Sequence, residues 1–307
     1  MARKKNPPMS GVPDPGFTWA RGSADALQLA GRRVAVVGGT DGLGRAIARV
    51  LARRGAEVTV VGRTFRDEGV ANVSFVRADL SSMKEARRVA RELPAERFDL
   101  VLFTTGILAA PTRETTREGI ERDMAVSYLS RLAMLRELAP RLGSARTEGA
   151  TKPRVFVMGF PGTGQLGEPV DDLNAERSYD AMKVHMNTVA GNEMLVLDGA
   201  WRYPALGVFG LNPGLIRTNI RANYLGEGSL KHRLTEWMIG LFTTSPEAYA
   251  ERIAPLLFAP ELDGRTGLHF NQKGIAILPT EALTPSHVER FLAASDALVE
   301  KALAATA

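Results

Sequence analysis

The sequence predicts an α/β fold: a doubly wound parallel sheet covered by helices on both faces, three layers (αβα), in a single domain. Short β-branched runs alternate with longer helical stretches along the chain, the pattern of a parallel sheet with crossover helices. Of the 307 residues, 45% are hydrophobic and 24% are charged, which excludes a disordered, collagen-like or coiled-coil chain. No repeat or low-complexity linker divides the chain, so we expect one large domain.

The first half of the chain supplies four of the expected strands. The run RVAVV is apolar after its first residue, which is typical of a strand buried on both faces. The segment that follows begins after several glycines and is rich in helix formers. In order, we predict a strand at residues 33–37, a helix at 43–54, strands at 57–61 and 73–76, a helix at 82–93, a strand at 100–103 and a helical stretch ending near residue 142.

The second half continues the same alternation. A polar loop, GSARTEGATKP, precedes its first strand, and the pair Thr284-Pro285 is a helix start signal near the end. In order, we predict a strand at residues 155–158, a helix at 183–201, a strand at 207–211, a helical stretch at 226–246, a helix at 247–258, a short strand at 268–271 and a terminal helix.

The ends of the chain are expected to differ from its body. We predict a flexible, Pro-rich tail at residues 1–30, the folded domain at 31–284 with a lid segment at 219–245, and a C-terminal helix at 285–307. The first residues are basic but lack the apolar stretch of a secretory signal. The longest apolar run is shorter than the roughly 18 residues of a membrane span. We therefore expect a soluble, cytoplasmic protein.

Composition also removes several kinds of chemistry. The absence of cysteine excludes a disulfide scaffold, a thiolate zinc site and a cysteine nucleophile. The four histidines are scattered, and we predict no metal site. The net charge of +5 comes from 39 basic and 34 acidic residues that form no single stripe, which disfavours nucleic acid as a partner. An anionic small ligand accounts for the basic excess equally well.

The segment VVGGTDGLGRAIA, residues 36–48, follows a predicted strand and opens a predicted helix, the context of a dinucleotide site. Gly38 permits the tight turn, Gly42 lets the backbone approach a pyrophosphate, and Gly44 lets the helix pack close to the sheet. The helix N-terminus presents free N–H groups to the phosphates. We predict cofactor contacts in this loop from Gly38, Thr40, Asp41, Gly42, Leu43 and Gly44.

The glycine spacing, three residues and then one, resembles the TGxxxGxG motif of the short-chain dehydrogenase/reductase family, with Val37 in the threonine position. The resemblance extends to about Leu278, and residues 244–270 resemble the retinol-dehydrogenase-like branch. It implies a Rossmann fold, a nicotinamide cofactor and oxidoreductase activity on a carbonyl or secondary alcohol. Outside the loop it implies cofactor contacts from Asp79, Leu80, Thr105, Gly106, Pro213, Gly214, Ile216 and Thr218.

The residue about twenty positions after the loop indicates which cofactor is preferred. An acidic residue there binds the ribose of NAD, whereas an arginine accommodates the 2′-phosphate of NADP. This chain has Gly62-Arg63-Thr64, and Arg45 or Arg66 is near enough in sequence to share the phosphate charge. We therefore predict that NADP(H) is preferred and that NAD(H) is the alternative. If Arg63 only solvates a loop, the preference disappears.

The resemblance implies a catalytic tyrosine with a lysine four residues later, and the chain offers Tyr179 and Lys183. Four residues make one helical turn, so both side chains would share a face. A neighbouring positive charge would then lower the pKa of the tyrosine. In this interpretation the chain is an NADP-dependent carbonyl reductase or alcohol dehydrogenase.

A second register is also open. Aligned without gaps to a retinol-dehydrogenase-like segment, Tyr179 becomes an earlier, non-catalytic tyrosine, and His185 takes the catalytic position. Val189 then replaces the lysine, and Asn192 matches a downstream asparagine. An imidazole could protonate an alkoxide, or serve acid–base chemistry without hydride transfer. A non-catalytic NADP-binding module is a third possibility.

Other positions depart from the family pattern. Phe160 stands where the resemblance places a serine, with Thr163 or Ser178 as substitutes, and the catalytic asparagine becomes Ser127 within AVSYLS. Phenylalanine has no hydrogen bond to donate to a carbonyl. The catalytic candidates are therefore Ser127, Tyr179, Lys183 and His185.

The segment after Pro213-Gly214 suggests the kind of substrate. Residues 219–242 are rich in aromatic, Leu and Met side chains, which favours an apolar carbonyl or alcohol substrate. The same side chains would equally suit the inner face of a lid helix or an oligomer contact. The helices around residues 125–142 and 183–201 could form a homodimer seam, although RLAMLREL is highly charged for one, and the oligomeric state stays open.

Overall fold

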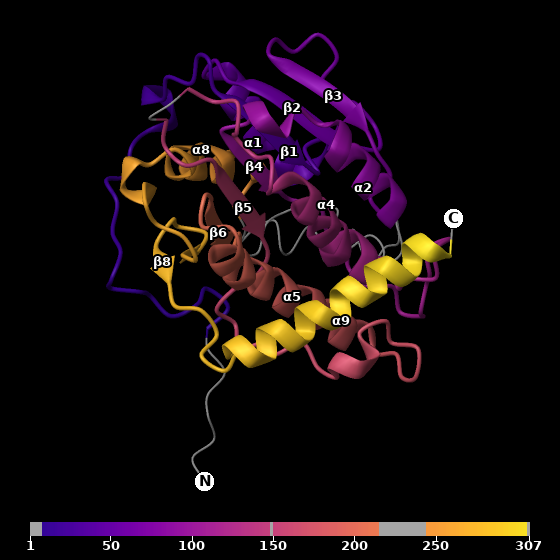
Figure 1. Ribbon diagram of the computed structural model, residues 1–307. Helices are drawn as coiled ribbons and strands as arrows, with labels where there is room; N and C mark the ends of the chain where they lie inside the picture. Colours follow the sequence, from indigo (N-terminus) through magenta and orange to yellow (C-terminus); the bar gives the residue numbers. More distant parts are fainter. Residues whose placement is uncertain (1–7, 148–149, 215–243, 306–307) are drawn as a thin grey trace.

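The computed structural model describes residues 8–147, 150–214 and 244–305. Its centre is an eight-stranded sheet in the order β3-β2-β1-β4-β5-β6-β7-β8 (Figure 1). All neighbouring strands are parallel except β7 and β8, which are antiparallel. The strands are β1 (Arg33–Val37), β2 (Glu57–Gly62), β3 (Val73–Arg77), β4 (Leu100–Phe103), β5 (Arg154–Met158), β6 (Gly207–Leu211), β7 (His269–Phe270) and β8 (Ala276–Ile277).

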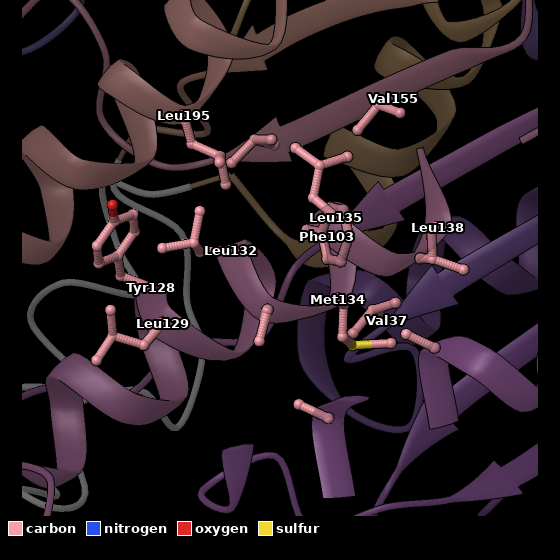
Figure 2. Packing of buried hydrophobic residues seen from close by; sticks show 14 of the residues in the cluster. Val37, Phe103, Tyr128, Leu129, Leu132, Met134, Leu135, Leu138, Val155 and Leu195 are labelled. Carbon is pink, nitrogen blue, oxygen red and sulfur yellow. The ribbon is translucent and has the colours of Figure 1, made fainter. Parts of the chain in front are cut away.

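Helices cover both faces of this sheet (Figure 1). One apolar core joins the sheet to α1 and α8, and the other joins it to α2, α4, α5 and α9. Figure 2 shows the second core around α4, where Leu132 and Leu135 lie among side chains from the sheet and from α5. Strands apolar on both sides require this cover, so the predicted three-layer fold is confirmed. The helices are α1 (Gly42–Arg53), α2 (Met83–Glu92), α3 (Arg122–Met124), α4 (Ser130–Leu138), α5 (Ala181–Arg202), α8 (Pro246–Leu257) and α9 (Pro285–Ala304).

The element predictions agree with the structure in order and type. The strands predicted at residues 33–37 and 207–211 match β1 and β6 residue for residue. The two-residue strand β8 was missed because so short a pairing has no periodicity to detect. The helical stretch at 226–246 and the lid segment at 219–245 lie almost entirely outside the described residues.

The predicted flexible tail needs correction for residues 8–30, which pack against the domain. Phe17 is buried and meets Phe270 edge-on, with ring centroids 5.7 Å apart. The Trp19 indole N–H donates to the Gly274 carbonyl at 2.7 Å, and Pro13 forms a bridge with Ile277 of β8. Burying these aromatic rings removes apolar surface from water, and this anchors a segment whose proline content suggested flexibility.

The C-terminal helix belongs to the folded domain. In Figure 1, α9 crosses over α4 and α5, and its buried residues include Phe291 and Leu292. It packs against the two helices predicted to form a homodimer seam, and the homodimer stays a prediction. Within the described ranges, no helix combines the length and apolar character needed to cross a membrane.

Candidate active site

The loop between β1 and α1 forms a backbone cradle at the carboxyl edge of the sheet. Gly38 has φ +90°, where glycine is favoured, and a Cβ there would lie 2.6 Å from the Thr105 nitrogen. A Cβ on Gly44 would collide with the Gly38 carbonyl and with Thr104. Only glycine therefore lets α1 begin this close to the end of β4. At the start of α1 the Gly42 N–H donates to the Asp41 carboxylate at 2.9 Å, and the helix N-terminus that follows is the kind of site that fits a dinucleotide pyrophosphate.

Three arginines near this cradle differ in what they bind. Arg45 pairs with the buried Asp67 at 2.8 Å, and Arg66 pairs with Asp41, the N-cap residue of α1. Arg63 is exposed and, within the described residues, has no hydrogen bond or ion pair. The preceding residue, Gly62, packs so closely against Thr40 of the phosphate loop that a Cβ there would collide with it. Arg63 is therefore the next residue along the chain after this contact.

The other predicted cofactor positions converge on the same edge of the sheet. Parallel strands end together, so segments that follow β3, β4 and β6 meet there. The Asp79 carboxylate accepts a hydrogen bond from the Ser81 hydroxyl at 2.9 Å, and the Gly214 N–H donates to Asn212 at 3.0 Å. The predicted residues at these strand ends are Asp79, Leu80, Thr105, Gly106, Pro213 and Gly214, whereas Ile216 and Thr218 lie outside the described residues.

Tyr179 and Lys183 do not form the pair expected from their spacing. Helix α5 begins at Ala181 with Asp180 as its N-cap residue, so Tyr179 precedes the helix and the shared-face argument is wrong. The Tyr179 hydroxyl donates to the Ala110 carbonyl at 2.5 Å. Burial and the nearby carboxylates Glu121 and Asp123 raise the pKa of Tyr179 to about 12. Lys183 is exposed and lines a separate cavity with Met182 and Met186.

His185 instead lies within α5 and faces a buried carboxylate. Its Nδ1 is 2.8 Å from Asp123 Oδ2, and the Asp123 side chain has no exposed surface. The other oxygen, Asp123 Oδ1, accepts a hydrogen bond from the Ser127 hydroxyl at 2.5 Å. Ser127 also accepts the Ile107 N–H at 3.0 Å, which ties the group to the segment after β4. The structure thus brings two catalytic candidates, Ser127 and His185, onto one aspartate.

A buried arginine lies next to this group. Arg131, in α4, donates to the Thr105 and Met158 carbonyls at the ends of β4 and β5 and to Asn192 Oδ1. The Asn192 amide in turn donates to the Ser127 carbonyl at 2.9 Å. Burial lowers the pKa of Arg131 to about 9, which Asp123 partly opposes. The guanidinium is therefore still charged near neutral pH.

The substitutes for the missing serine do not reach this group. The Thr163 hydroxyl donates to the Phe160 carbonyl at 2.8 Å within its own loop. Ser178 is exposed, and its N–H donates to Asp172 at 3.3 Å. Neither hydroxyl is hydrogen bonded to His185 or Asp123 in the described part of the chain.

Sequence reasoning missed Asp123 and Arg131, although their spacing carried a signal. Asp123, Ser127 and Arg131 are four residues apart in turn, a spacing that places side chains on one face of a helix. A π-helical turn at Ala125–Leu129 joins α3 to α4. Because a π turn contains more residues than an α turn, side chains spaced by four stay close to one line.

Comparison with known proteins identifies the class. A family model described as short chain dehydrogenase matches residues 32–150. An uncharacterized oxidoreductase of Saccharomyces cerevisiae is 50% identical over 294 residues, covering 94% of this chain and 95% of that protein. The chain belongs to the short-chain dehydrogenase/reductase family and is an oxidoreductase of that type.

Two further comparisons agree with this family. Retinol dehydrogenase 14 of Homo sapiens is 25% identical over 308 residues, covering 91% of this chain and 89% of that protein. A short-chain dehydrogenase of Shigella flexneri, whose structure was determined with NADP, superimposes with a TM-score of 0.57 at 19% identity. That match covers 80% of this chain and 98% of the other, and it supports the Rossmann fold.

Proposed function

We propose that the chain is an NADP(H)-dependent oxidoreductase acting on a ketone or secondary alcohol, with His185 exchanging the proton of the substrate oxygen. The observation that carries the proposal is the His185–Asp123 contact of 2.8 Å beside the carboxyl ends of the strands. When bound, the nicotinamide supplies or accepts a hydride at the substrate carbon. The residues of this chain then have to supply or accept one proton at the oxygen.

Asp123 makes His185 suitable for that task. A buried carboxylate that accepts from Nδ1–H fixes the imidazole tautomer, and this leaves Nε2 to exchange the proton. In carbonyl reduction, the imidazolium donates its Nε2 proton to the substrate oxygen, and Asp123 stabilises the charged ring. In alcohol oxidation, neutral Nε2 accepts that proton. Ser127 holds the second Asp123 oxygen at 2.5 Å, so the carboxylate cannot rotate away.

The arginines around the phosphate loop support a preference for NADP(H). Arg45 and Arg66 are engaged with Asp67 and Asp41, which leaves Arg63 for a 2′-phosphate. The NADP bound to the Shigella flexneri relative supports the same cofactor. We propose NAD(H) only as a weaker ligand.

The substrate class rests on the sequence. The apolar lid segment favours an apolar ketone or alcohol, although residues 219–243 lie outside the described part of the chain. The similar human protein is named a retinol dehydrogenase, which supports an alcohol or the corresponding carbonyl compound as the substrate. A cytoplasmic location stays a prediction.

The proton-transfer role is tested by comparing His185→Gln with Tyr179→Phe. With NADPH and a panel of apolar ketones, we expect His185→Gln to lower kcat by about 100-fold or more, because general acid catalysis is worth that much. Tyr179→Phe is the matched control and should stay within about threefold of the parent rate, since its hydroxyl is bound to a backbone carbonyl. The measurement is the loss of NADPH absorbance.

The other outcomes separate the alternatives. A large loss in Tyr179→Phe with little change in His185→Gln would restore the Tyr179 and Lys183 interpretation. NADPH binding by the parent protein without hydride transfer in either direction would favour non-redox acid–base chemistry or a non-catalytic module.

A further inference from the structure

Arg131 is a buried cation without an ion pair. The residue is 3% exposed, and no carboxylate among the described residues lies within ion-pair distance of its guanidinium. Its hydrogen-bond partners among the described residues are neutral oxygens: the Thr105 and Met158 carbonyls, the Asn192 amide at 2.9 Å and the Thr105 hydroxyl at 3.3 Å. These four hydrogen bonds leave one of the five guanidinium N–H groups over. Retaining an unpaired buried charge is costly, so it requires a reason beyond packing.

The place of this charge in the fold suggests the reason. The phosphate loop follows β1, whereas Arg131 is bonded to the ends of β4 and β5. In a doubly wound sheet the dinucleotide lies across the switch point between these two halves. The β4–β5 side would hold the half of a bound cofactor that is remote from the loop, which is the nicotinamide half. His185, the proposed proton donor, reaches the same side from α5 through Asp123.

We propose that Arg131 makes the site favour the reduced nicotinamide over the oxidised one. This inference rests on the proposed function. The oxidised ring carries a positive charge that the reduced ring lacks, so a buried cation disfavours only the oxidised form. The same cation stabilises negative charge that develops on a carbonyl oxygen during reduction. Arg131 is a positioning residue, because it acts through the field and through the carbonyls it holds.

The charges that face Arg131 are few. Asp123 from α3 offsets part of its field, but both Asp123 oxygens are already engaged by His185 and Ser127. From α5, the contact comes from the neutral amide of Asn192. The field of the guanidinium is therefore only partly neutralised by this chain.

The test is a binding titration with NADPH and, separately, NADP⁺, on the parent protein, Arg131→Met and Arg131→Lys. We expect the parent to bind NADPH more tightly. In Arg131→Met the ratio of the NADP⁺ to the NADPH dissociation constant should fall about tenfold, because a charge interaction at low effective dielectric has been removed. Arg131→Lys keeps the charge, and its ratio should stay within about twofold of the parent value.

A ratio that is equal in the parent and in a folded Arg131→Met would overturn the proposal. Thermal unfolding of each variant shows whether it is folded. If Arg131→Met does not fold, the test rests on the two dissociation constants of the parent. A parent that binds NADP⁺ as tightly as NADPH contradicts the inference. If the parent binds neither cofactor, it is the proposed function that fails.

Discussion

At the scale of single residues, the site is distinguished by which charges are paired. Arg45 and Arg66 are paired with Asp67 and Asp41, so each already has a carboxylate partner. Arg63 is exposed beside the phosphate loop with no such partner in the described part of the chain. A guanidinium free to form two parallel hydrogen bonds suits a phosphate.

Replacing Arg63 should therefore change cofactor preference. We expect Arg63→Ala to weaken NADPH binding by about tenfold or more, since hydrogen bonds to charged groups are worth about 1.5 kcal/mol or more, and to leave NADH binding unchanged. Arg97→Ala is the matched control, because Arg97 is also exposed but precedes β4, at the opposite edge of the sheet. Calorimetric titration measures both cofactors. An unchanged NADPH affinity in Arg63→Ala would assign the arginine to solvation only.

At the scale of elements, the contact between the β1–α1 loop and the end of β4 depends on glycine. Gly31 and Gly38 both have a positive φ, +79° and +90°, but a Cβ on Gly31 would meet nothing within 4 Å, whereas on Gly38 it would meet Thr105. The two positions therefore separate the cost of the backbone conformation from the cost of close packing.

Alanine at these two positions should have different effects on stability. Gly31→Ala should cost about 1 kcal/mol, the cost of a left-handed conformation. Gly38→Ala should add about 1–3 kcal/mol of overpacking and should also lose NADPH binding, because α1 must move from β4. Urea unfolding with linear extrapolation measures both variants. Equal losses of stability in the two variants would show that the end of β4 moves to accommodate the methyl group at no cost in free energy.

The π-helical turn is the other element that shapes the site. It lies between Asp123 and Arg131 and brings both toward the strand ends, where His185 and Asn192 meet them from α5. A regular helix would turn side chains four residues apart progressively away from one another. The site therefore depends on one irregular turn in the middle of a buried helix.

At the scale of the whole molecule, the sheet buries a histidine whose ring has no hydrogen-bond partner among the described residues. His269 is fully buried in β7, and neither ring nitrogen has a partner among the described residues. Its ring packs over Gly210 of the neighbouring strand, where a Cβ would collide with Nδ1. Burial lowers the pKa of His269 to about 4, so the ring is neutral in the folded protein.

This histidine should make the fold sensitive to acid. The folded-state pKa of about 4 lies below the unfolded value of 6.5, so the unfolded chain binds the proton first and the free energy of unfolding falls as the pH drops from 6.5 to 4. The loss from His269 reaches about 3 kcal/mol. Between pH 6.5 and 4, the free energy of unfolding of His269→Leu should therefore fall by about 3 kcal/mol less than that of the parent. Urea unfolding at several pH values measures this difference.

Glu121 contributes with the opposite sign, so the test compares the variant with the parent. Burial raises its pKa to about 7, and its protonation therefore stabilises the fold as the pH falls below 7. Both proteins retain this contribution, and it cancels in the difference. Parallel curves for His269→Leu and the parent would mean that His269 gains a partner or water on protonation.

The sequence predicted the fold in detail because its signals are local. Apolar runs such as RVAVV mark buried strands wherever they occur, and the loop at residues 36–48 carries its glycines at fixed spacing. Two local signals misled. Prolines suggested a free tail where Phe17 and Trp19 anchor the chain, and the spacing of Tyr179 and Lys183 assumed a helix that starts two residues later, at Ala181.

The sequence alone therefore determined the αβα sheet, the phosphate loop and the family resemblance, since each depends on residues close together in the chain. Only the tertiary structure chose between Tyr179 and His185 as the side chain that meets a buried acid, because Asp123 lies 62 positions from His185 in the chain. The same holds for Arg131, whose partners come from β4, β5 and α5. Contacts between distant segments leave no periodic trace in a sequence, and the chemistry that we propose rests on those contacts.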